Sequence, residues 1–210
     1  MGESGAGKTT SLRNLDPATT FIIDADRKGE SWRGWKKQYN VDSKNFFQTS
    51  KVPTIEKIME KVDKELTSIK VLVIDGLSTI MVDDEVERMK EKGYDRWISL
   101  AQCIWKIVSD APLMRDDLTV IFIGHAQTDR DENGFEFTRL KTSGRKLDKL
   151  TVESKFNTVL LAKCIDGNHI FETQANRSTA KSPIGCFEKV IENDAAFVVE
   201  ALKKYEDGEE

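Results

Sequence analysis

Gly2-Glu3-Ser4-Gly5-Ala6-Gly7-Lys8-Thr9 is the stretch that decides the fold, and Thr10 follows it. The stretch matches the pattern G-x-x-x-x-G-K-[ST] at every fixed position. Its glycines permit backbone conformations that turn successive N–H groups toward an anion, which suits phosphate oxygens. We therefore predict that residues 2–10 bind the phosphates of a nucleotide, and that a helix starting at about Lys8 points its positive end at them. In this arrangement Lys8 reaches the β and γ phosphates, and the Thr9 hydroxyl holds Mg²⁺.

An acidic residue at the end of a neighbouring strand completes such a site, because it holds the water shell of the magnesium ion. The apolar run Val71–Ile74 is followed by Asp75, which we predict in this role. The next residue is Gly76 rather than Glu, so a base that polarises water has to come from elsewhere. Asp26 lies two residues beyond a second strand, Thr20–Asp24, and is the candidate. An ordinary strand-ending Asp75 and a solvated acidic turn at Asp26 are the alternative interpretations.

Further along the chain, apolar strands alternate with segments of helical periodicity. The expected elements are helices at Pro53–Ile69, Tyr94–Asp110 and Asp194–Tyr205, a strand at Leu118–Gly124, and a C-terminal β-hairpin of Lys155–Lys163 and Asn168–Thr173. Residues 126–145 show no clear period, and we expect a loop there. The alternation predicts one α/β domain over residues 1–205, with a mostly parallel sheet, helices on both faces, and an acidic tail at 206–210.

Composition excludes several classes of protein. Among the 210 residues 39% are hydrophobic and 32% charged, and no apolar run approaches the roughly 18 to 20 residues of a membrane span. The three cysteines and two histidines are far apart, which disfavours a disulfide framework or a zinc site and makes a reducing cytoplasm the default location. The formal net charge of −4 argues against nucleic-acid binding by bulk charge alone.

Taken in order, these motifs resemble the RecA-like ATPase core, and most closely the small phage P-loop proteins of the "AAA domain" type, which include phage RecA-like single-strand-annealing recombinases. The resemblance runs from Gly2 to about Lys163. It implies ATP and Mg²⁺ as ligands, with Lys8, Asp75 and Asp26 as catalytic residues and His125 as the sensor of the γ phosphate. Asp26 stands where the family usually has Glu and is one methylene shorter, which bears on the rate of hydrolysis.

Two family segments have no counterpart in this sequence. One is the central strand that precedes the phosphate-binding loop, so either the start of the chain is clipped or the sheet lacks this strand. The other is the N-terminal segment through which RecA proteins polymerise, so any homo-oligomer has to form in another way.

In the resembled fold, the loop after the sensor strand, here about Ala126–Leu150, binds single-stranded DNA. Residues 139–149 carry five basic side chains and one acidic side chain, a local net charge of +4, and Phe135 and Phe137 precede them as stacking candidates. The predicted DNA-binding residues are Arg139, Lys141, Arg145, Lys146 and Lys149. The alternative is a solvated basic loop. Arg177 and Lys181 faintly resemble the basic residues that RecA relatives extend into the ATP site of a neighbouring subunit. The alternative interpretation of these two residues is a basic surface turn.

The sequence thus predicts an ATP-binding protein that hydrolyses ATP slowly with Mg²⁺. It also predicts that hydrolysis is coupled to single-stranded DNA binding in phage recombination or replication, in the host cytoplasm. Two rival functions stay open. One is a nucleotide or small-molecule kinase, with residues 126–150 as a lid over the phosphates. The other is a nucleotide-dependent binding module that does not hydrolyse ATP.

Overall fold

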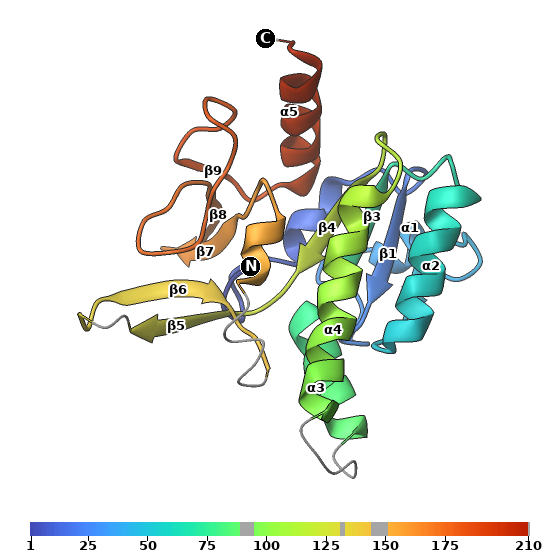
Figure 1. Cartoon of the computed structure of the whole chain (residues 1–210). Helices are drawn as coiled ribbons and strands as arrows, with labels where there is room; N and C mark the ends of the chain where they lie inside the picture. The colour runs from blue at the N-terminus through green and yellow to red at the C-terminus, as the bar shows by residue number, and fades with distance from the viewer. Residues whose placement is uncertain (89–94, 131–132, 144–150, 210) are drawn as a thin grey trace.

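A parallel four-stranded sheet forms the centre of the computed structural model, which describes residues 1–88, 95–130, 133–143 and 151–209 (Figure 1). Its strand order is β2-β1-β3-β4. The strands are β1 (Thr20–Asp24), β2 (Phe46–Gln48), β3 (Val71–Asp75) and β4 (Thr119–Ile123). Every residue of β1 and β3 is buried, as expected of parallel strands that are covered on both faces. The register places Asp24 beside Asp75, so the acidic ends of these two strands meet at one edge of the sheet.

Helices cover both faces of this sheet, which confirms the expected α/β class. On one face lie α2 (Val52–Lys64), α3 (Leu77–Glu87) and α4 (Asp95–Asp110), and their buried residues join the apolar side chains of β1 and β3 in one core. On the other face lie the short 3₁₀ helix η1 (Thr10–Asn14), α1 (Trp35–Gln38) and α5 (Ala195–Asp207), with a second core around Leu12 and Tyr39.

Helix ends differ from the sequence expectation at two places. Helix α2 ends at Lys64 rather than Ile69, and the Arg115 guanidinium donates to the backbone oxygens of Val62 and Asp63 in its last turn and of Ile69 beyond it. These bonds pair carbonyls that have no partner inside the helix. Helix α5 starts after Asp194, whose carboxylate accepts a hydrogen bond from the Ala196 N–H at 2.9 Å, and it runs through Asp207 into the segment expected to be a tail.

The expected loop at residues 126–145 contains instead an antiparallel hairpin of β5 (Ala126–Arg130) and β6 (Glu136–Leu140), so this prediction was wrong. The hairpin projects from the body of the molecule (Figure 1). Its strands carry polar side chains on both faces, which hides the period of two that marks a half-buried strand. The segment around Ser178 stabilises it by pairing with Thr138 of β6.

A third sheet contains β7 (Leu161–Ile165), β8 (Asn168–Glu172) and β9 (Val190–Glu192), in that order. Asp166 and Gly167 connect β7 to β8 with φ angles of 50° and 80°, as in a tight two-residue hairpin turn. Strand β7 begins at Leu161 rather than at the expected Lys155, which is the last residue of the short 3₁₀ helix Val152–Lys155. Between the two elements, Val159 pairs with Lys181 in an isolated bridge.

The first two residues connect the central sheet to β7. Gly2 forms parallel bridges to His125, just beyond β4, and to Ala162 of β7. This position fixes the start of the glycine-rich loop between two sheet edges. Across the ranges that the structure describes, no helix has the length and apolar character needed to cross a membrane.

Candidate nucleotide site

The glycine-rich loop curls over the start of η1. Gly5 and Gly7 have φ angles of 78° and 91°, the region where glycine carries no steric cost. The Ala6 N–H donates to the Glu3 carbonyl at 3.2 Å, and the Ser11 N–H donates to the Gly7 carbonyl at 2.9 Å. The helix begins at Thr10 in 3₁₀ form, so the expected start at about Lys8 was wrong by two residues.

Thr9 and Asp75 join this loop to the sheet. The Thr9 hydroxyl donates to Asp75 Oδ2 at 2.7 Å, and both residues are buried, Asp75 to 3% exposure. Burial raises the pKa of Asp75 to about 6, although the hydrogen bond from Thr9 acts in the opposite direction. The structure therefore brings together the two residues to which the sequence assigns the magnesium site.

Asp26 lies beside this pair. Its two carboxylate oxygens accept hydrogen bonds from the Thr79 hydroxyl and the Lys28 ammonium. Burial acts to raise the pKa of Asp26, but these two bonds and the charge of Lys28 outweigh it, so the pKa lies below its ordinary value. A Cβ atom on Gly76 would lie 2.7 Å from Asp26 Oδ1. The absence of a side chain after Asp75 thus gives Asp26 its place.

Lys8 and His125 complete the group predicted from the sequence. The Lys8 ammonium donates to the Glu3 carbonyl of its own loop at 2.6 Å, and burial lowers its pKa. The backbone N–H of His125 donates to the Ser78 hydroxyl at 3.0 Å. Burial lowers the pKa of His125, and the positive charge of Lys8 lowers it further. Both side chains thus share one electrostatic environment at the carboxyl edge of the sheet.

The remaining loop residues line the outer side of the site. Glu3, Ser4, Gly5 and Ala6 border a cavity of about 410 Å³, whose opposite wall is formed by β7 and Thr138. The Thr10 hydroxyl and the Ser31 hydroxyl share a hydrogen bond of 2.8 Å. Thr10 therefore ties the loop to the segment that follows Asp26.

Two residues near the site were missed by sequence reasoning. His169 of β8 packs against the glycine-rich loop so closely that a Cβ on Gly7 would lie 2.9 Å from its Cγ. Glu30 is buried to 7% exposure near Asp75 and Asp24, whose charges add to the effect of burial and raise its pKa to about 8. No local signal marks His169, because only the β7–β8 turn brings it here. Glu30 resembles part of a solvated charged turn in the sequence.

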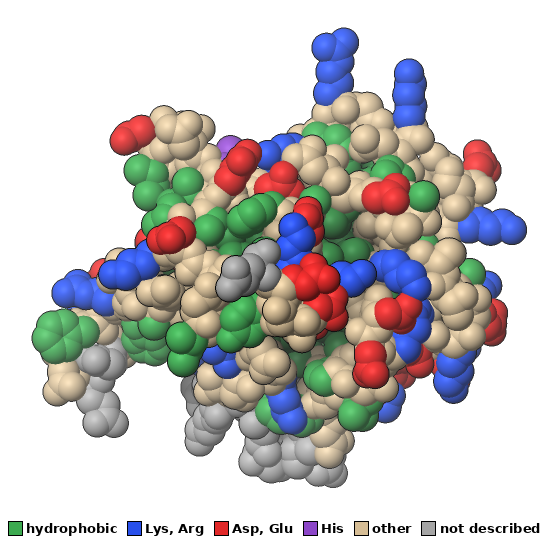
Figure 2. Space-filling model, turned by 90° about the horizontal axis from the view of Figure 1, so that it is seen from above, with side chains coloured by type: hydrophobic (Ala, Val, Ile, Leu, Met, Phe, Trp, Pro, Cys, Tyr) green, Lys and Arg blue, Asp and Glu red, His purple; other side chains and the backbone are tan. Residues whose placement is uncertain are grey.

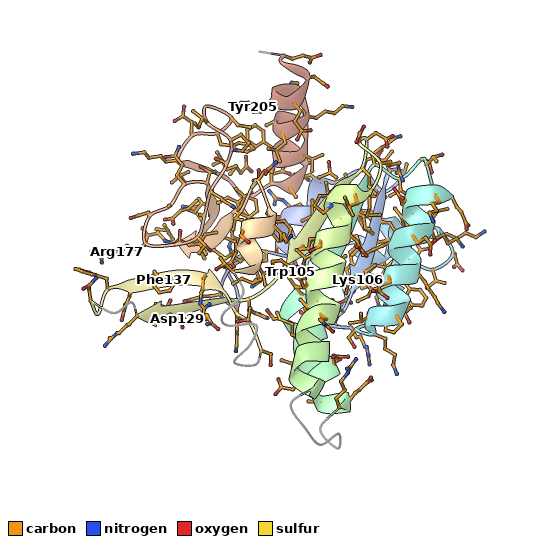
Figure 3. All side chains as sticks on the ribbon, viewed as in Figure 1. Trp105, Lys106, Asp129, Phe137, Arg177 and Tyr205 are labelled. Atoms are coloured by element: carbon orange, nitrogen blue, oxygen red, sulfur yellow. The ribbon has the colours of Figure 1, made fainter. Side chains whose placement is uncertain are left out.

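The predicted DNA-binding residues have different placements. Arg139 of β6 forms an ion pair with Asp129 of β5, so its charge is balanced within the hairpin. Lys141 is exposed just after β6. Figure 3 labels Phe137 and Asp129 on the hairpin and Arg177 beside it. Arg145, Lys146 and Lys149 lie outside the described residues.

Arg177 and Lys181, the candidate finger residues, lie on the segment that joins the sheets. The Arg177 carbonyl accepts from the Thr138 N–H at 2.8 Å, and Lys181 exchanges two backbone hydrogen bonds with Val159. These contacts tie the backbone of both residues to this chain's own strands, whereas both residues are exposed.

A glycine-rich phosphate loop, a buried Thr–Asp pair and an acid-rich carboxyl edge of a parallel sheet together define a P-loop nucleotide-binding domain. The model of the family described as "AAA domain" matches residues 1–184, and the chain belongs to this family. Membership indicates a nucleotide-binding P-loop ATPase. A comparison with curated proteins gave no match.

Proposed function

We propose that the protein is a slow, Mg²⁺-dependent ATPase whose hydrolysis is coupled to single-stranded DNA, in phage recombination or replication. The observation that carries this proposal is the buried Thr9–Asp75 hydrogen bond, with Asp26 seated beside it. It connects the phosphate loop to the acidic ends of two neighbouring strands, the arrangement that phosphoryl transfer to water requires.

The residues present fit Mg²⁺. A hydroxyl and a carboxylate are the oxygen ligands that this ion takes, directly or through its water shell. Burial keeps the pKa of Asp75 near 6, and a divalent cation would favour its ionised form. Thr9 and Asp75 would hold the ion. When bound, it neutralises charge on the phosphate oxygens.

In this proposal Asp26 acts as the base and Lys8 stabilises the charge on the phosphates. Asp26 accepts a proton from the water that attacks the γ phosphorus, while the bond from this phosphorus to the bridging oxygen breaks and ADP leaves. Its lowered pKa keeps it ionised at neutral pH but makes it a weak base, which supports slow hydrolysis. The Lys8 ammonium stabilises the charge on the phosphates, after exchanging the Glu3 carbonyl for phosphate oxygens.

His125 supports the coupling to DNA. Its carbonyl accepts from the Lys141 N–H at 2.7 Å, at the end of β6, and it immediately precedes β5. A shift of His125 toward the γ phosphate would therefore pull on both strands of the hairpin. The coupling free energy is the same in both directions, so DNA bound to the hairpin would in turn favour the position of His125 close to the γ phosphate.

The β5–β6 hairpin and the residues that follow it are the proposed DNA surface. Phe135, near the hairpin tip, is 60% exposed and suits stacking on an unpaired base. Lys141 and the sequence-predicted Arg145, Lys146 and Lys149 supply positive charge, whereas Arg139 is paired with Asp129. Acidic and basic side chains are interspersed on the face seen in Figure 2, so a local site fits better than a broad charged face.

The test of hydrolysis is the rate of phosphate release from ATP, with and without single-stranded DNA. We expect Lys8→Ala to abolish ATP binding and Asp26→Asn to abolish release while leaving ATP binding intact. Asp116→Asn, an exposed acid before β4, is the matched control and should behave as wild type. Phosphate release unchanged in Lys8→Ala would refute the proposal. ATP binding without any release would favour the non-hydrolysing module, and phosphate transfer to a nucleoside acceptor would favour a kinase.

The test of DNA binding is oligonucleotide affinity as a function of salt. We expect Phe135→Ala with Lys141→Ala to weaken binding about tenfold or more, and Arg145→Ala with Lys146→Ala to reduce the salt slope. Lys57→Ala, an exposed cation on α2, is the control. Affinity and salt slope unaltered in both double variants would exclude this surface.

A basic finger acting between subunits is the remaining element of the proposal. If Arg177 or Lys181 reaches the ATP of a neighbouring copy, Arg177→Ala with Lys181→Ala should lose activity. Mixing this double variant with Lys8→Ala subunits should then restore phosphate release above the level of either alone. No restoration, at concentrations where the chain is oligomeric, would exclude the finger.

A further inference from the structure

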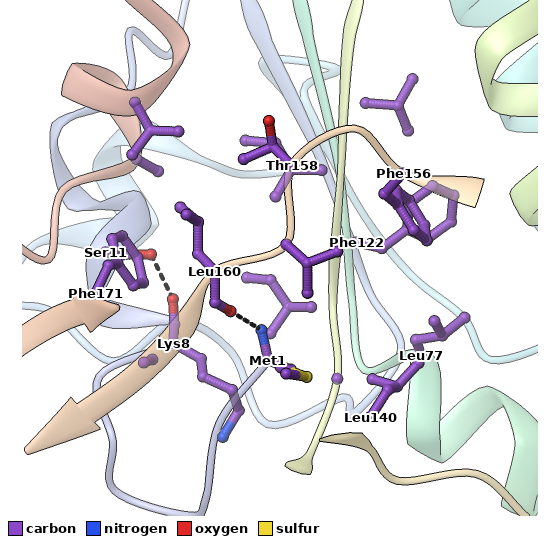
Figure 4. A pocket seen from close by; sticks show the side chains of 18 of the residues that line it. Met1, Lys8, Ser11, Leu77, Phe122, Leu140, Phe156, Thr158, Leu160 and Phe171 are labelled. Atoms are coloured by element: carbon purple, nitrogen blue, oxygen red, sulfur yellow. Dashed lines mark hydrogen bonds between the residues drawn. The ribbon is translucent and has the colours of Figure 1, made fainter. Parts of the chain in front are cut away.

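The start of β8 lies against the glycine-rich loop, away from the residues proposed to hold the metal ion and the γ phosphate. Ala6 of the loop packs in one core cluster with Ala162 of β7 and Phe171 of β8. Phe171 also lines one cavity together with Lys8 and Ser11, as Figure 4 shows. The third sheet is therefore a direct neighbour of the loop that binds phosphate.

One face of the β7–β8 hairpin makes this contact. In the register of the two strands, Ala162 is opposite Phe171, and Cys164 is opposite His169. Alternate residues of a strand share a face, and opposite residues of a pair share it too, so these four side chains lie on the side of the loop. His169 is so close to Gly7 that a Cβ on this glycine would lie 2.9 Å from both Cγ and Nδ1 of the imidazole.

The imidazole of His169 differs from a side chain that only packs against the loop. It is exposed, whereas Phe171 on the same face of β8 is buried. Across the ranges that the structure describes, its ring nitrogens have no hydrogen-bond partner. A flat, unpaired ring beside a phosphate-binding loop suits stacking on the base of a nucleotide.

The position of the metal site indicates which part of the nucleotide meets this ring. Thr9 contacts Asp75 of β3, and Asp26 follows β1, so the proposed positions of the metal ion and the γ phosphate are at the central sheet. His169 contacts the loop from the third sheet, at Gly7. The base and the γ phosphate are at opposite ends of a nucleoside triphosphate. With the γ phosphate at the central sheet, the ribose and base extend toward the third sheet.

We propose that His169 is the base contact of this site, with its imidazole ring stacked on the base of the bound nucleoside triphosphate. Stacking accepts any base, so this contact adds affinity without selecting adenine. The base would also cover Cys164, because directly opposite residues of a strand pair have Cβ atoms about 5 Å apart. The inference rests on the nucleotide binding of the proposed function, and neither hydrolysis nor DNA enters it.

The test compares the affinity for ATP with the affinity for inorganic triphosphate, which has the phosphates but no base, both with Mg²⁺. The variants are His169→Ala, which removes the ring, and His169→Phe, which keeps a ring. Asn168→Ala is the matched control, because Asn168 is exposed on the same strand and its side chain lies on the other face. The Tm of each chain shows whether a substitution disturbs the fold.

We expect His169→Ala to weaken ATP binding about tenfold or more and to leave triphosphate binding within about twofold of the unmodified chain. His169→Phe should restore the ATP affinity to within about threefold, and Asn168→Ala should match the unmodified chain. Unchanged ATP affinity in His169→Ala, or equal losses for ATP and triphosphate, would overturn the proposal. No ATP binding by the unmodified chain would refute the proposed function, and this contact with it.

The Cys164 thiol provides a second measurement that needs no substitution. It is exposed, so iodoacetamide should alkylate it in the free protein. We expect ATP to slow this alkylation about fivefold or more and triphosphate to leave it unchanged, with the half-buried Cys186 as the internal reference. Equal slowing by both ligands would assign the effect to the loop and overturn the base contact. No slowing by ATP would place the base away from this face and overturn it as well.

Discussion

Glu30 is a carboxyl group buried in an unfavourable place. Its side chain is 7% exposed, and neither carboxylate oxygen has a hydrogen-bond partner among the described residues. Burial is the main cause that raises its pKa to about 8, and the negative charges of Asp75, Asp24 and Asp26 add to it, against Lys28. Glu30 is therefore mostly protonated in the folded protein at neutral pH.

This raised pKa makes stability fall as the pH rises. The ordinary value is 4.5, so between pH 4.5 and about 8 the folded state keeps a proton that the unfolded chain releases. The free energy of unfolding decreases over this window, because the folded state binds more protons. The two pKa values correspond to a loss of about 3 kcal/mol at pH 7 and about 5 kcal/mol above pH 8, relative to acid conditions.

The perturbation is Glu30→Gln, which has the shape of the protonated acid and does not titrate. We expect the variant to be more stable than wild type by about 3 kcal/mol or more at pH 9 and equally stable within about 1 kcal/mol at pH 5. The assay is urea unfolding at these two pH values, without nucleotide or Mg²⁺. The Met1 amine titrates in the opposite direction, since its pKa is lowered to about 5, but it is common to both chains and cancels.

Glu188→Gln is the matched control, because Glu188 is exposed. This variant should follow wild type at both pH values. If Glu30→Gln also gave a pH dependence parallel to that of wild type, the carboxyl group of Glu30 would be ionised in the folded state, and the reasoning from its burial would be refuted.

Three further predictions follow from the geometry. Thr9→Val removes the donor to Asp75 and should weaken Mg²⁺-dependent ATP binding about tenfold or more by calorimetry; unchanged affinity would exclude Thr9 from the metal site. Gly7→Ala places a Cβ at φ 91° and 2.9 Å from His169 Cγ, so ATP binding should be lost and unfolding should cost about 1–3 kcal/mol less; wild-type melting would contradict the loop geometry. Arg115→Met removes the donors to backbone carbonyls in the last turn of α2 and at Ile69, and should lower the free energy of unfolding by about 2 kcal/mol or more; a change below about 0.5 kcal/mol would show that water replaces these bonds.

Elements defined by local pattern were predicted well from the sequence. The strands Thr20–Asp24 and Val71–Asp75 have the expected boundaries, because a continuous apolar run bounded by polar residues is itself the condition for a buried parallel strand. The pairing of Thr9 with Asp75 follows from the same cause. Once the loop motif and the strand end are recognised, a parallel sheet brings both to one edge.

Features that depend on distant contacts could not be predicted in this way. The β5–β6 hairpin is stabilised by its backbone ladder, by the ion pair of Asp129 with Arg139, and by the backbone near Ser178, none of which leaves an apolar period in the sequence. His169 reaches Gly7 only because the third sheet folds back over the loop. Their placement is a property of the assembled chain.

Gly76 shows how a local interpretation changes once a distant residue is placed. In the sequence, glycine after Asp75 means that the position where a catalytic carboxylate is sought is empty. In the structure, the same position has a φ of 106°, and a Cβ there would come within 2.7 Å of Asp26 Oδ1 and 3.1 Å of its backbone nitrogen. An acidic side chain after Asp75 and the observed Asp26 are therefore sterically incompatible. The missing side chain and the proposed base from the neighbouring strand are one coupled feature, so Gly76→Ala should displace Asp26 and reduce phosphate release as strongly as a change at Asp26 itself.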